Sequence, residues 1–339
     1  MSFSQVDKKI FDSIKKARDN NFLVFSRVAT YLNEFPCLIT EDAIKEITGG
    51  VVENEQMAFY IFLSGALSEN DTLSRLFERE YFNRGVRKLD PREYLENPYF
   101  KNIKIPNKQA GTWTLGYQAY KAYEGFIWKD IEVLDDYKEV PQIGFFDREF
   151  SFPTVFENGV EWMAIKPNEI ETMKHHIQKM RGRVAVFGLG IGYFAYMVSE
   201  KSDVEEIVII ERDENVIKLF NEYILPQFSN KDKIKIVKAD AFDYAENKMP
   251  DEQFDKAFVD LWHDTSDGVD LYMKIKKLEC KSPKTEFCYW IEKSILSSIR
   301  WRIFEAIENQ VEREKFTGTI SDIKTYLSEN YLKNFVKFI

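Results

Sequence analysis

The stretch VAVFGLGIGYFAYM, residues 184–197, decides the fold of this chain. Four apolar residues lead into three glycines at alternate positions, Gly188, Gly190 and Gly192, and an aromatic-rich helical pattern follows. Glycines placed after a strand let the backbone approach a ligand closely, and the next helix directs its free amide donors at that ligand. We therefore expect a strand, a ligand-binding turn and a helix over these residues.

Apolar strands and helical segments alternate on both sides of this stretch. Pro167 opens a helix before it, and further strands are expected at 206–211, 234–240, 256–262 and 286–291. Alternation at this pitch is typical of a parallel sheet with helices on both faces. We predict an α/β fold with a Rossmann-like, doubly wound, mostly parallel sheet over residues 167–339.

Residues 1–166, before this alternating region, show different sequence patterns. Apolar residues spaced by three and four, such as Ile10 and Ile14, predict a helical N-terminal domain over residues 1–125. Residues 126–166 consist of short apolar runs between turn residues, with Asn158-Gly159 as a hairpin signal. We expect a small β-hairpin region there, connecting the helical and Rossmann-like domains.

The C-terminal part begins with a long helix. Ile295, Ile299, Ile303 and Ile307 keep a four-residue spacing, so we expect this helix to pack on the sheet. A Thr-Gly-Thr break, another helix and the apolar run NFVKFI follow, and only this run could supply a further strand. We therefore expect the N-terminal domain to cover the bound acceptor.

The glycine spacing indicates the kind of ligand. The dinucleotide fingerprint G-x-G-x-x-G places its third glycine three positions after the second, where this chain has Tyr193. The third glycine is instead Gly192, which gives G-x-G-x-G. This form favours a ligand that has no pyrophosphate and lays an amino acid and a nucleoside across the loop.

Three carboxylates follow the expected strands. Glu211 ends the second strand, where a carboxylate can accept both ribose hydroxyls. Asp240 ends the third strand and precedes Ala241, and Asp260 ends the fourth, beside the point where ligands of open sheets bind. Each alone is compatible with a solvated strand end, but three behind one glycine loop favour a common ligand.

Over residues 167–310 the chain resembles the class I S-adenosylmethionine-dependent methyltransferases, in FGLGIG, IVIIERD, VKADAF and FDKAFVD. The resemblance implies that the glycines line the methionine part of S-adenosyl-L-methionine, the second-strand residues the ribose, the third-strand residues the adenine and the last carboxylate the ammonium group. The cofactor-binding residues that it implies are Gly188, Gly190, Gly192, Glu211, Arg212, Asp240, Ala241 and Asp260. The family often has an acidic residue before the first glycine, where this chain has Phe187, so Asp260 or Glu169 becomes the candidate partner of the ammonium group.

Within that superfamily the chain is most similar to the spermidine synthases, in NEIETM and ERDENVIKLFNEYILP. Those enzymes carry a G-G-G-D-G loop and a Y-H-E run, whereas this chain has Ile191 in place of the aspartate and ETMKHH without the tyrosine. These departures favour methyl transfer over aminopropyl transfer from decarboxylated cofactor. A non-catalytic protein that binds the cofactor and engages a partner remains a third hypothesis.

The segment DLWHDTSDG, residues 260–268, is expected to overhang the reacting group. Methyl transfer needs alignment of the acceptor and a base where the acceptor holds a proton, so Asp260, His263 and Asp264 are the catalytic candidates. The alternative is that His263 is a loop histidine and that Asp264, Ser266 and Asp267 cap a helix beginning near Val269.

Composition limits the partners. A net charge of −9 and a pI near 5.2 argue against DNA and anionic membranes, and no apolar run approaches the ~20 residues that cross a bilayer. Three cysteines without a C-x-x-C pair indicate neither a disulfide framework nor a metal site. We expect a cytoplasmic enzyme acting on a small-molecule or protein methyl acceptor, and a homodimer is compatible with the sequence.

Overall fold

The expected parallel sheet is present in the structure, a computed structural model that describes residues 4–49 and 54–335. Its strands are β10 (Gly182–Phe187), β11 (Val204–Glu211), β12 (Ile234–Lys238), β13 (Lys256–Val259) and β14 (Glu286–Tyr289). Every adjacent pair is parallel, and the order is β12-β11-β10-β13-β14. This is the order of the first five strands of the Rossmann fold, so the predicted fold class is confirmed.

The order reverses beside β10, and this reversal positions the site. Phe187, the last residue of β10, is paired with Ile210 of β11 on one side and with Val259 of β13 on the other. The carboxyl ends of the three strands therefore lie level at one edge of the sheet. Open α/β sheets bind ligands at such an edge.

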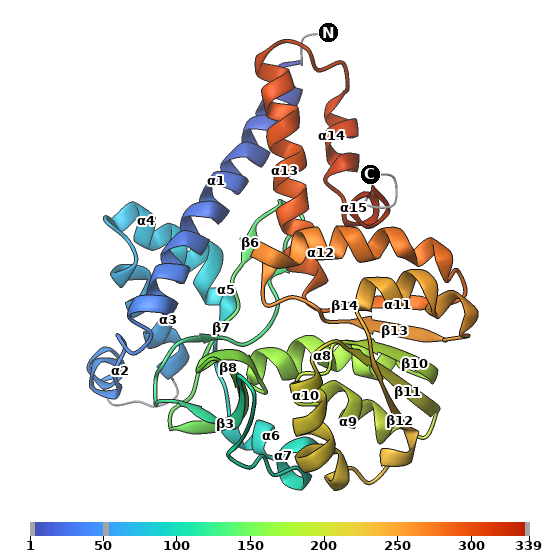
Figure 1. Cartoon of the computed structure of the whole chain (residues 1–339). Coiled ribbons are helices and arrows are strands. Elements are labelled where there is room, and N and C mark those ends of the chain that lie inside the picture. Colours follow the sequence, from blue (N-terminus) through green and yellow to red (C-terminus); the bar gives the residue numbers. More distant parts are fainter. Residues whose placement is uncertain (1–3, 50–53, 336–339) are drawn as a thin grey trace. The chain divides into compact units, whose positions relative to one another are not determined.

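Helices cover both faces of the sheet. In Figure 1, α8 (Pro167–Lys179), α9 (Tyr193–Ser199) and α10 (Glu214–Leu219) lie on one face, and α11 (Ala241–Asn247) and α12 (Thr265–Leu278) on the other. Because both faces are covered, the central strands are mostly apolar; the last four residues of β10 and all of β13, including Lys256 at its start, are buried.

A second, antiparallel sheet accompanies the first. It has the order β2-β3-β8-β9, with β2 (Lys108–Ala110), β3 (Trp113–Tyr120), β8 (Phe150–Glu157) and β9 (Val160–Ala164), and is preceded by α6 (Pro91–Leu95) and α7 (Pro98–Asn102). Asn158 and Gly159 join β8 to β9 with φ angles of 51° and 81°. Two successive positive φ angles are what a two-residue hairpin needs, so the predicted hairpin is confirmed.

The chain forms two compact units built from interleaved segments. The sheet unit comprises Arg92–Ala119 and Ser151–Ile295, and the helical unit comprises the described residues of Met1–Pro91 together with Tyr120–Phe150 and Leu296–Phe335. The expected regions 1–125, 126–166 and 167–339 do not coincide with these units. That each of the three expected regions forms a domain of its own stays a prediction.

The helical unit is mostly α-helical, as expected for the first part of the chain. Its elements are α1 (Gln5–Glu34), α2 (Glu41–Thr48), α3 (Glu55–Ala66), α4 (Asp71–Leu76), a π-helical turn at Phe77–Phe82, α5 (Asn83–Gly85), most of α13 (Glu292–Glu312), α14 (Ile320–Tyr326) and α15 (Glu329–Phe335). Short strands complete it: β1 (Val86–Lys88), β7 (Ile143–Phe145) and β4 (Phe126–Ile127) form one sheet, and β5 (Glu132–Val133) pairs with β6 (Glu139–Val140).

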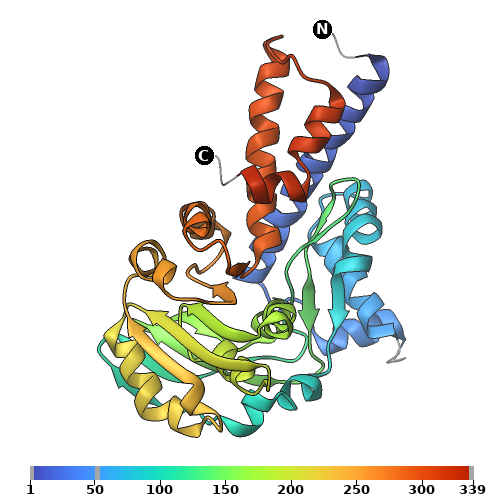
Figure 2. The same ribbon diagram turned by 90° about the vertical axis from the view of Figure 1, so that its right-hand side faces the viewer.

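The expectation that the long C-terminal helix packs on the parallel sheet is wrong for α13 beyond Ile295. Phe304 and Ile307 of α13 are buried in a cluster with Phe11 and Ile14 of α1 and with residues of α14. The two long helices run side by side in both ribbon views (Figures 1 and 2). The apolar stripe of α13 therefore contributes to the core of the helical unit.

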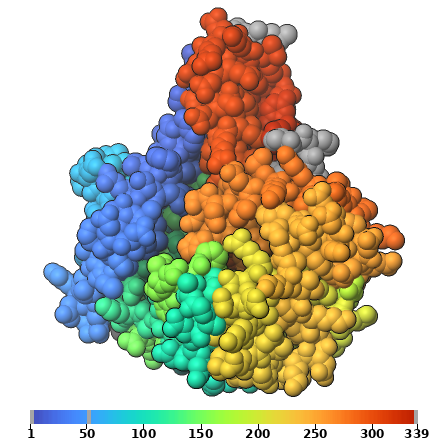
Figure 3. Space-filling view, in the orientation of Figure 1, coloured from blue at the N-terminus to red at the C-terminus, as the bar shows by residue number. Residues whose placement is uncertain are grey.

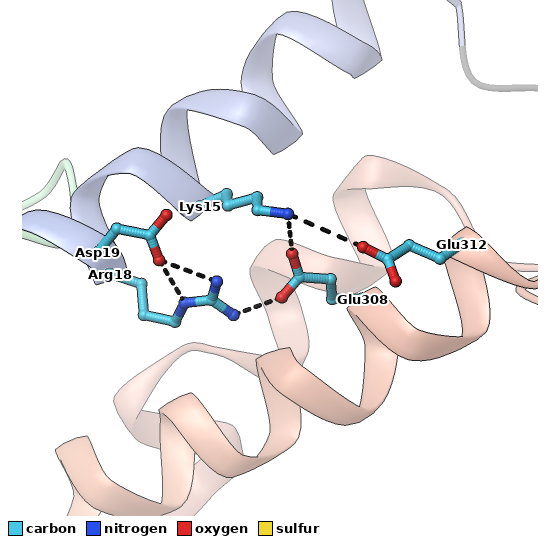
Figure 4. A network of polar contacts seen from close by, with 5 residues as sticks. All are labelled: Lys15, Arg18, Asp19, Glu308 and Glu312. Carbon is cyan, nitrogen blue, oxygen red and sulfur yellow. Dashed lines mark hydrogen bonds and ion pairs between the residues drawn. The ribbon is translucent and has the colours of Figure 1, made fainter. Parts of the chain in front are cut away.

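Ion pairs flank this cluster. Glu308 of α13 pairs with both Lys15 and Arg18 of α1, and Lys15 also approaches Glu312 at 3.8 Å (Figure 4). Arg18 makes a further pair with Asp19 at 2.9 Å. The ion pairs of Glu308 with α1 join segments almost 300 residues apart in the sequence.

The end of the chain supplies no strand within the described residues. The run NFVKFI begins inside α15, which extends to Phe335, and its remaining part lies outside them. Of the helices in residues 4–49 and 54–335, none combines the length and apolarity that a membrane crossing requires.

Candidate functional site

A pocket with a volume of about 390 Å³ lies at the carboxyl ends of the parallel strands, and all of its lining residues belong to the sheet unit. Figure 3 shows a hollow on this face between segments coloured light green, yellow and orange. The pocket brings together most of the residues predicted from the sequence: Gly188, Gly190, Glu211, Arg212, Asp240, Ala241, Asp260 and His263. Gly192 and Asp264 do not line it.

The glycine turn is shaped by close approaches. Gly188 has a φ of 97°, and a Cβ added there would lie 2.2 Å from the carbonyl oxygen of Asp260. Gly192 has a φ of 76°, and a Cβ there would lie 2.3 Å from the ring of Phe220. Only glycine fits either position. For Gly192, helix packing rather than ligand approach explains the residue.

The turn is held from outside by α7, a contact that the sequence analysis missed. The hydroxyl of Tyr99 donates a hydrogen bond of 2.5 Å to the carbonyl oxygen of Ile191, within the turn. Asn97 Nδ2 donates to the Tyr193 hydroxyl at 3.0 Å, and Tyr99 is fully buried against the rings of Tyr193 and Tyr196. No motif marks these residues, because the contact joins positions 92 residues apart.

Glu211 is tied to the glycine turn through the backbone. Its Oε2 accepts from the N–H of Leu189 at 3.2 Å, and its Oε1 accepts from the N–H of Asp213 at 2.8 Å. A carboxylate offers about four lone-pair positions, so Glu211 keeps acceptor capacity for a ligand. The bonds fix the carboxylate at the shared edge of β10 and β11.

Asp240 and Ala241 lie at the start of α11. Asp240 Oδ1 accepts from the N–H groups of Phe242 and Asp243 at 2.9 and 3.0 Å, so it is the N-cap of this helix. The capping role satisfies amides that the helix leaves unpaired. It also fixes an acidic side chain at the rim of the pocket.

Asp260 and Glu169 form an acidic pair on the pocket wall. Burial raises the pKa of Asp260 to about 7. Burial, and secondly the charge of Asp260, raise the pKa of Glu169 well above its ordinary value. Neither side chain has a hydrogen-bond or ion-pair partner among the described residues. Two desolvated carboxyls close enough to feel each other's charge resist ionising together, and a cationic ligand would relieve that cost.

The segment after β13 caps the following helix, so the capping alternative is confirmed for Asp264 and Asp267, whereas Ser266 lies inside the helix and contributes only its N–H. Asp264 Oδ1 accepts from Ser266 N at 2.6 Å, and Asp267 accepts from the N–H groups of His263 and Asp264. The helix begins at Thr265, four residues before the expected start. The hydrogen bond from Ser266 lowers the pKa of Asp264.

His263 lines the pocket with about half of its side chain exposed. Its ring lies 6.0 Å from that of Trp162, which stands edge-on to Trp113 at 5.7 Å. Trp262 is buried against Tyr289, and within the described residues its Nε1 has no hydrogen-bond partner. Asn168 also lines the pocket, and its buried Oδ1 likewise has no hydrogen-bond partner among the described residues.

The lining is acidic and rich in tryptophan. Lys166 and Arg212 are its two full cations, and Trp113, Trp162, Trp262 and Trp290 are four of the chain's six tryptophans. The eight carboxylates on the lining are Glu157, Glu161, Glu169, Glu211, Asp213, Asp240, Asp260 and Asp267. This imbalance favours a positively charged ligand.

Comparisons with known proteins add structural likenesses at low similarity. No protein-family model matches the chain. No curated protein matches it either. Similar solved structures include a spermidine synthase from Thermotoga maritima, with a TM-score of 0.30, 18% identity and coverage of 40% of this chain and 49% of that one. A spermidine synthase in complex with the transition-state analogue AdoDATO has a TM-score of 0.30, 16% identity and coverage of 40% and 48%.

A third structure is described as an O-methyltransferase, from Klebsiella pneumoniae. It has a TM-score of 0.25, 16% identity and coverage of 31% of this chain and 46% of that chain. The matched part of this chain thus spans about half the length of each of these proteins. The strand order and the glycine turn of the chain itself define its α/β, Rossmann-like fold.

Proposed function

We propose that this chain is a transferase that uses an S-adenosyl sulfonium cofactor and moves the methyl group of S-adenosyl-L-methionine to a small-molecule or protein acceptor. One observation carries the proposal. The glycine turn and the Glu211 carboxylate, joined by the Leu189 N–H bond, lie together at the level carboxyl ends of β10 and β11. A pocket of about 390 Å³, within the range of small-molecule sites, adjoins them.

The residues present fit such a cofactor. Gly188 and Gly190 offer bare backbone to the methionine part, and Glu211 retains acceptor positions for the ribose hydroxyls. Asp240 and Ala241, at the start of α11, would face the adenine. Asp260 or Glu169, each without a hydrogen-bond or ion-pair partner among the described residues, is our candidate for holding the ammonium group.

When bound, the cofactor would supply a methyl group already activated on sulfur. The chain's own residues then have two tasks, to align the acceptor and to remove its proton. Asp260 and His263 line the pocket and are our candidates for proton transfer. Asp264 is ionised as a helix cap and does not line the pocket, so we assign it no proton transfer.

A Glu211→Gln substitution tests the ribose assignment. It keeps the size of the side chain and removes the charge, and a hydrogen bond to a charged group contributes about 1.5–3 kcal/mol. We expect the Kd for adenosylhomocysteine, measured by calorimetry, to rise at least about tenfold. Glu214→Gln is the matched control, since Glu214 is exposed on α10 and outside the lining. Unchanged affinity in Glu211→Gln contradicts the assignment.

The acidic lining favours a second candidate, aminopropyl transfer from decarboxylated cofactor. Removing the carboxylate from the cofactor leaves a dication, whereas Lys166, a cation that would receive that carboxylate, already pairs with Glu161 at 2.5 Å. Calorimetric titration with both cofactor forms distinguishes the two. Tighter binding of the decarboxylated form would replace methyl transfer by aminopropyl transfer.

A further inference from the structure

Glu211 owes its position to a chain of hydrogen bonds that extends beyond the glycine turn. Its Oε1 accepts from the N–H of Asp213 at 2.8 Å. Oδ1 of Asp213 caps α10 by accepting from the N–H groups of Asn215 and Val216 at 2.8 and 3.3 Å. Oδ2 of Asp213 accepts from the indole N–H of Trp113 at 3.0 Å. The residue that orients Glu211 is therefore itself held on both of its side-chain oxygens.

Trp113 comes from the antiparallel sheet, and its own position is fixed. It is the first residue of β3 and is 6% exposed. The turn before it lies against the start of α10, since a Cβ added to Gly111 would be 2.8 Å from Nδ2 of Asn215. The carbonyl oxygen of Thr112 accepts from the N–H of Asn158 at 2.9 Å, which joins this turn to the hairpin of β8 and β9. The indole N–H is thus presented by rigid elements of the sheet unit.

We infer that Trp113 is a positioning residue for the cofactor, which acts through Asp213 to hold the Glu211 carboxylate in place for the two sugar hydroxyls of the nucleoside. The inference rests on the proposed function for the role of Glu211, and it adds the residue that sets how strongly those hydroxyls are recognised. A contact to two hydroxyls depends on a fixed carboxylate, because small displacements lengthen one bond or the other. No sequence motif marks Trp113, which lies 100 positions before Asp213.

The alternative is that Trp113 only fills space beside Trp162, whose ring stands edge-on to it at 5.7 Å. In that case its loss lowers stability and weakens every nucleoside in the pocket by the same factor. A positioning role instead weakens ligands that carry the sugar hydroxyls more than ligands that lack them. The ratio of two affinities therefore separates the two roles.

Two probes measure this ratio in the full-length protein. Adenosylhomocysteine and its 2′,3′-dideoxy analogue differ only in the two sugar hydroxyls. We expect calorimetry to give the dideoxy analogue a Kd at least about tenfold higher in the wild-type protein, since bonds to a charged group are lost. In Trp113→Phe, which keeps a ring and removes the indole N–H, this ratio should fall at least about threefold. An unchanged ratio in Trp113→Phe overturns the inference.

Trp128→Phe is the matched control. The Trp128 Nε1 is buried and has no hydrogen-bond partner among residues 4–49 and 54–335, and Trp128 lies outside the pocket lining. The change therefore removes an indole without breaking a hydrogen bond, and the ratio should stay at the wild-type value. Urea denaturation reports any loss of stability separately. A fall of the ratio in both variants assigns the effect to general loosening of the protein, and the inference fails.

Asp213→Asn breaks the same link from its other end. Asparagine keeps an oxygen that can cap α10 but turns an NH2 group toward the indole, so the bond from Trp113 is lost. We expect the ratio to fall as far as in Trp113→Phe, and to fall no further in the double variant. Additive losses contradict action through Asp213. Should Trp113→Phe fail to fold, Asp213→Asn decides alone, and an unchanged ratio there overturns the inference.

The wild-type titrations separate failure of this inference from failure of the proposed function. If adenosylhomocysteine does not bind, or binds no better than its dideoxy analogue, the ribose assignment of Glu211 falls and this inference falls with it. If the wild-type protein prefers adenosylhomocysteine and the ratio is unchanged in Trp113→Phe and Asp213→Asn, the proposed function stands and only the positioning role is refuted.

Discussion

At the scale of residues, the site depends on carboxylates whose surroundings differ. Glu211, Asp240 and Asp267 accept backbone amides, which fixes their positions, whereas Asp260 and Glu169 face the pocket without such partners. The first group can be predicted from position, because strand ends and helix starts attract carboxylates. The second group owes its chemistry to burial, which raises the pKa of both carboxyls, and the charge of Asp260 raises the pKa of Glu169 further.

Asp260→Asn should reveal this raised pKa as a dependence of stability on pH. The pKa of Asp260 is about 7 in the folded protein against an ordinary value of 3.8, so the folded state binds more protons between these values. The contribution of Asp260 to the free energy of unfolding therefore falls as pH rises from about 4 to about 7. We expect the Tm of Asp260→Asn, relative to wild type, to rise across that window and to level off above it.

Asp203→Asn is the control for this measurement. Its side chain is 58% exposed in the same unit, so its Tm difference from wild type between pH 4 and pH 8 gives the baseline for replacing an exposed aspartate. Scanning calorimetry at half-unit pH intervals gives both curves. A flat difference for Asp260→Asn would mean that its carboxyl is ionised at low pH in the folded protein, and that the acidic pair is not desolvated.

At the scale of elements, periodicity predicted the strands of the parallel sheet and the hairpin at Asn158-Gly159, since each follows from a local pattern. Periodicity also identified the apolar stripe of α13, but it could not say what that stripe faces. A spacing of four residues shows which side of a helix is buried, and the same spacing suits a sheet or another helix. Phe304 and Ile307 in fact meet α1.

The contact of α7 with the glycine turn belongs to this scale, and Tyr99→Phe tests it. The change removes one hydroxyl and leaves the buried carbonyl of Ile191 without the bond that Tyr99 donates. An unsatisfied buried group costs about 1–3 kcal/mol, which urea denaturation should detect. Because the turn loses an anchor, we also expect the Kd for adenosylhomocysteine to rise about threefold to tenfold.

Tyr117→Phe is the matched control. The Tyr117 hydroxyl accepts a hydrogen bond from Ile105 N at 3.2 Å, and its side chain is about half exposed, so water can replace the lost group. Its effect on unfolding should be smaller, and the affinity for adenosylhomocysteine should not change. If Tyr99→Phe loses stability but keeps full affinity, α7 supports the fold without positioning the turn.

At the scale of the whole molecule, the segments of the two units alternate along the chain. Residues 296–335 complete the helical unit after the chain has built the parallel sheet. Sequence reasoning divided the chain into consecutive regions because composition changes along the sequence. No local pattern shows that the last helices belong with the first ones. The contacts that join them in the helical unit connect residues separated by more than 150 positions.

A buried ion pair within the helical unit tests this closure. Arg300 of α13 donates to Glu139 of β6 at 2.8 Å and to the carbonyl oxygen of Leu327 at 3.0 Å, and both charged side chains are 5% exposed. Removing one partner of such a pair leaves an uncompensated buried charge, which costs about 3–5 kcal/mol. We expect Arg300→Met to lower the free energy of unfolding, measured in urea, by about that amount.

Two further variants distinguish the ion pair from simple loss of packing. Lys45→Met breaks an exposed pair with Glu41 in the same unit and should cost no more than about 1 kcal/mol. Adding Glu139→Gln to Arg300→Met removes the stranded charge, so the double variant should be more stable than Arg300→Met alone. If the second change destabilises the protein further, Glu139 is held by groups other than Arg300, and the pair does not close the helical unit.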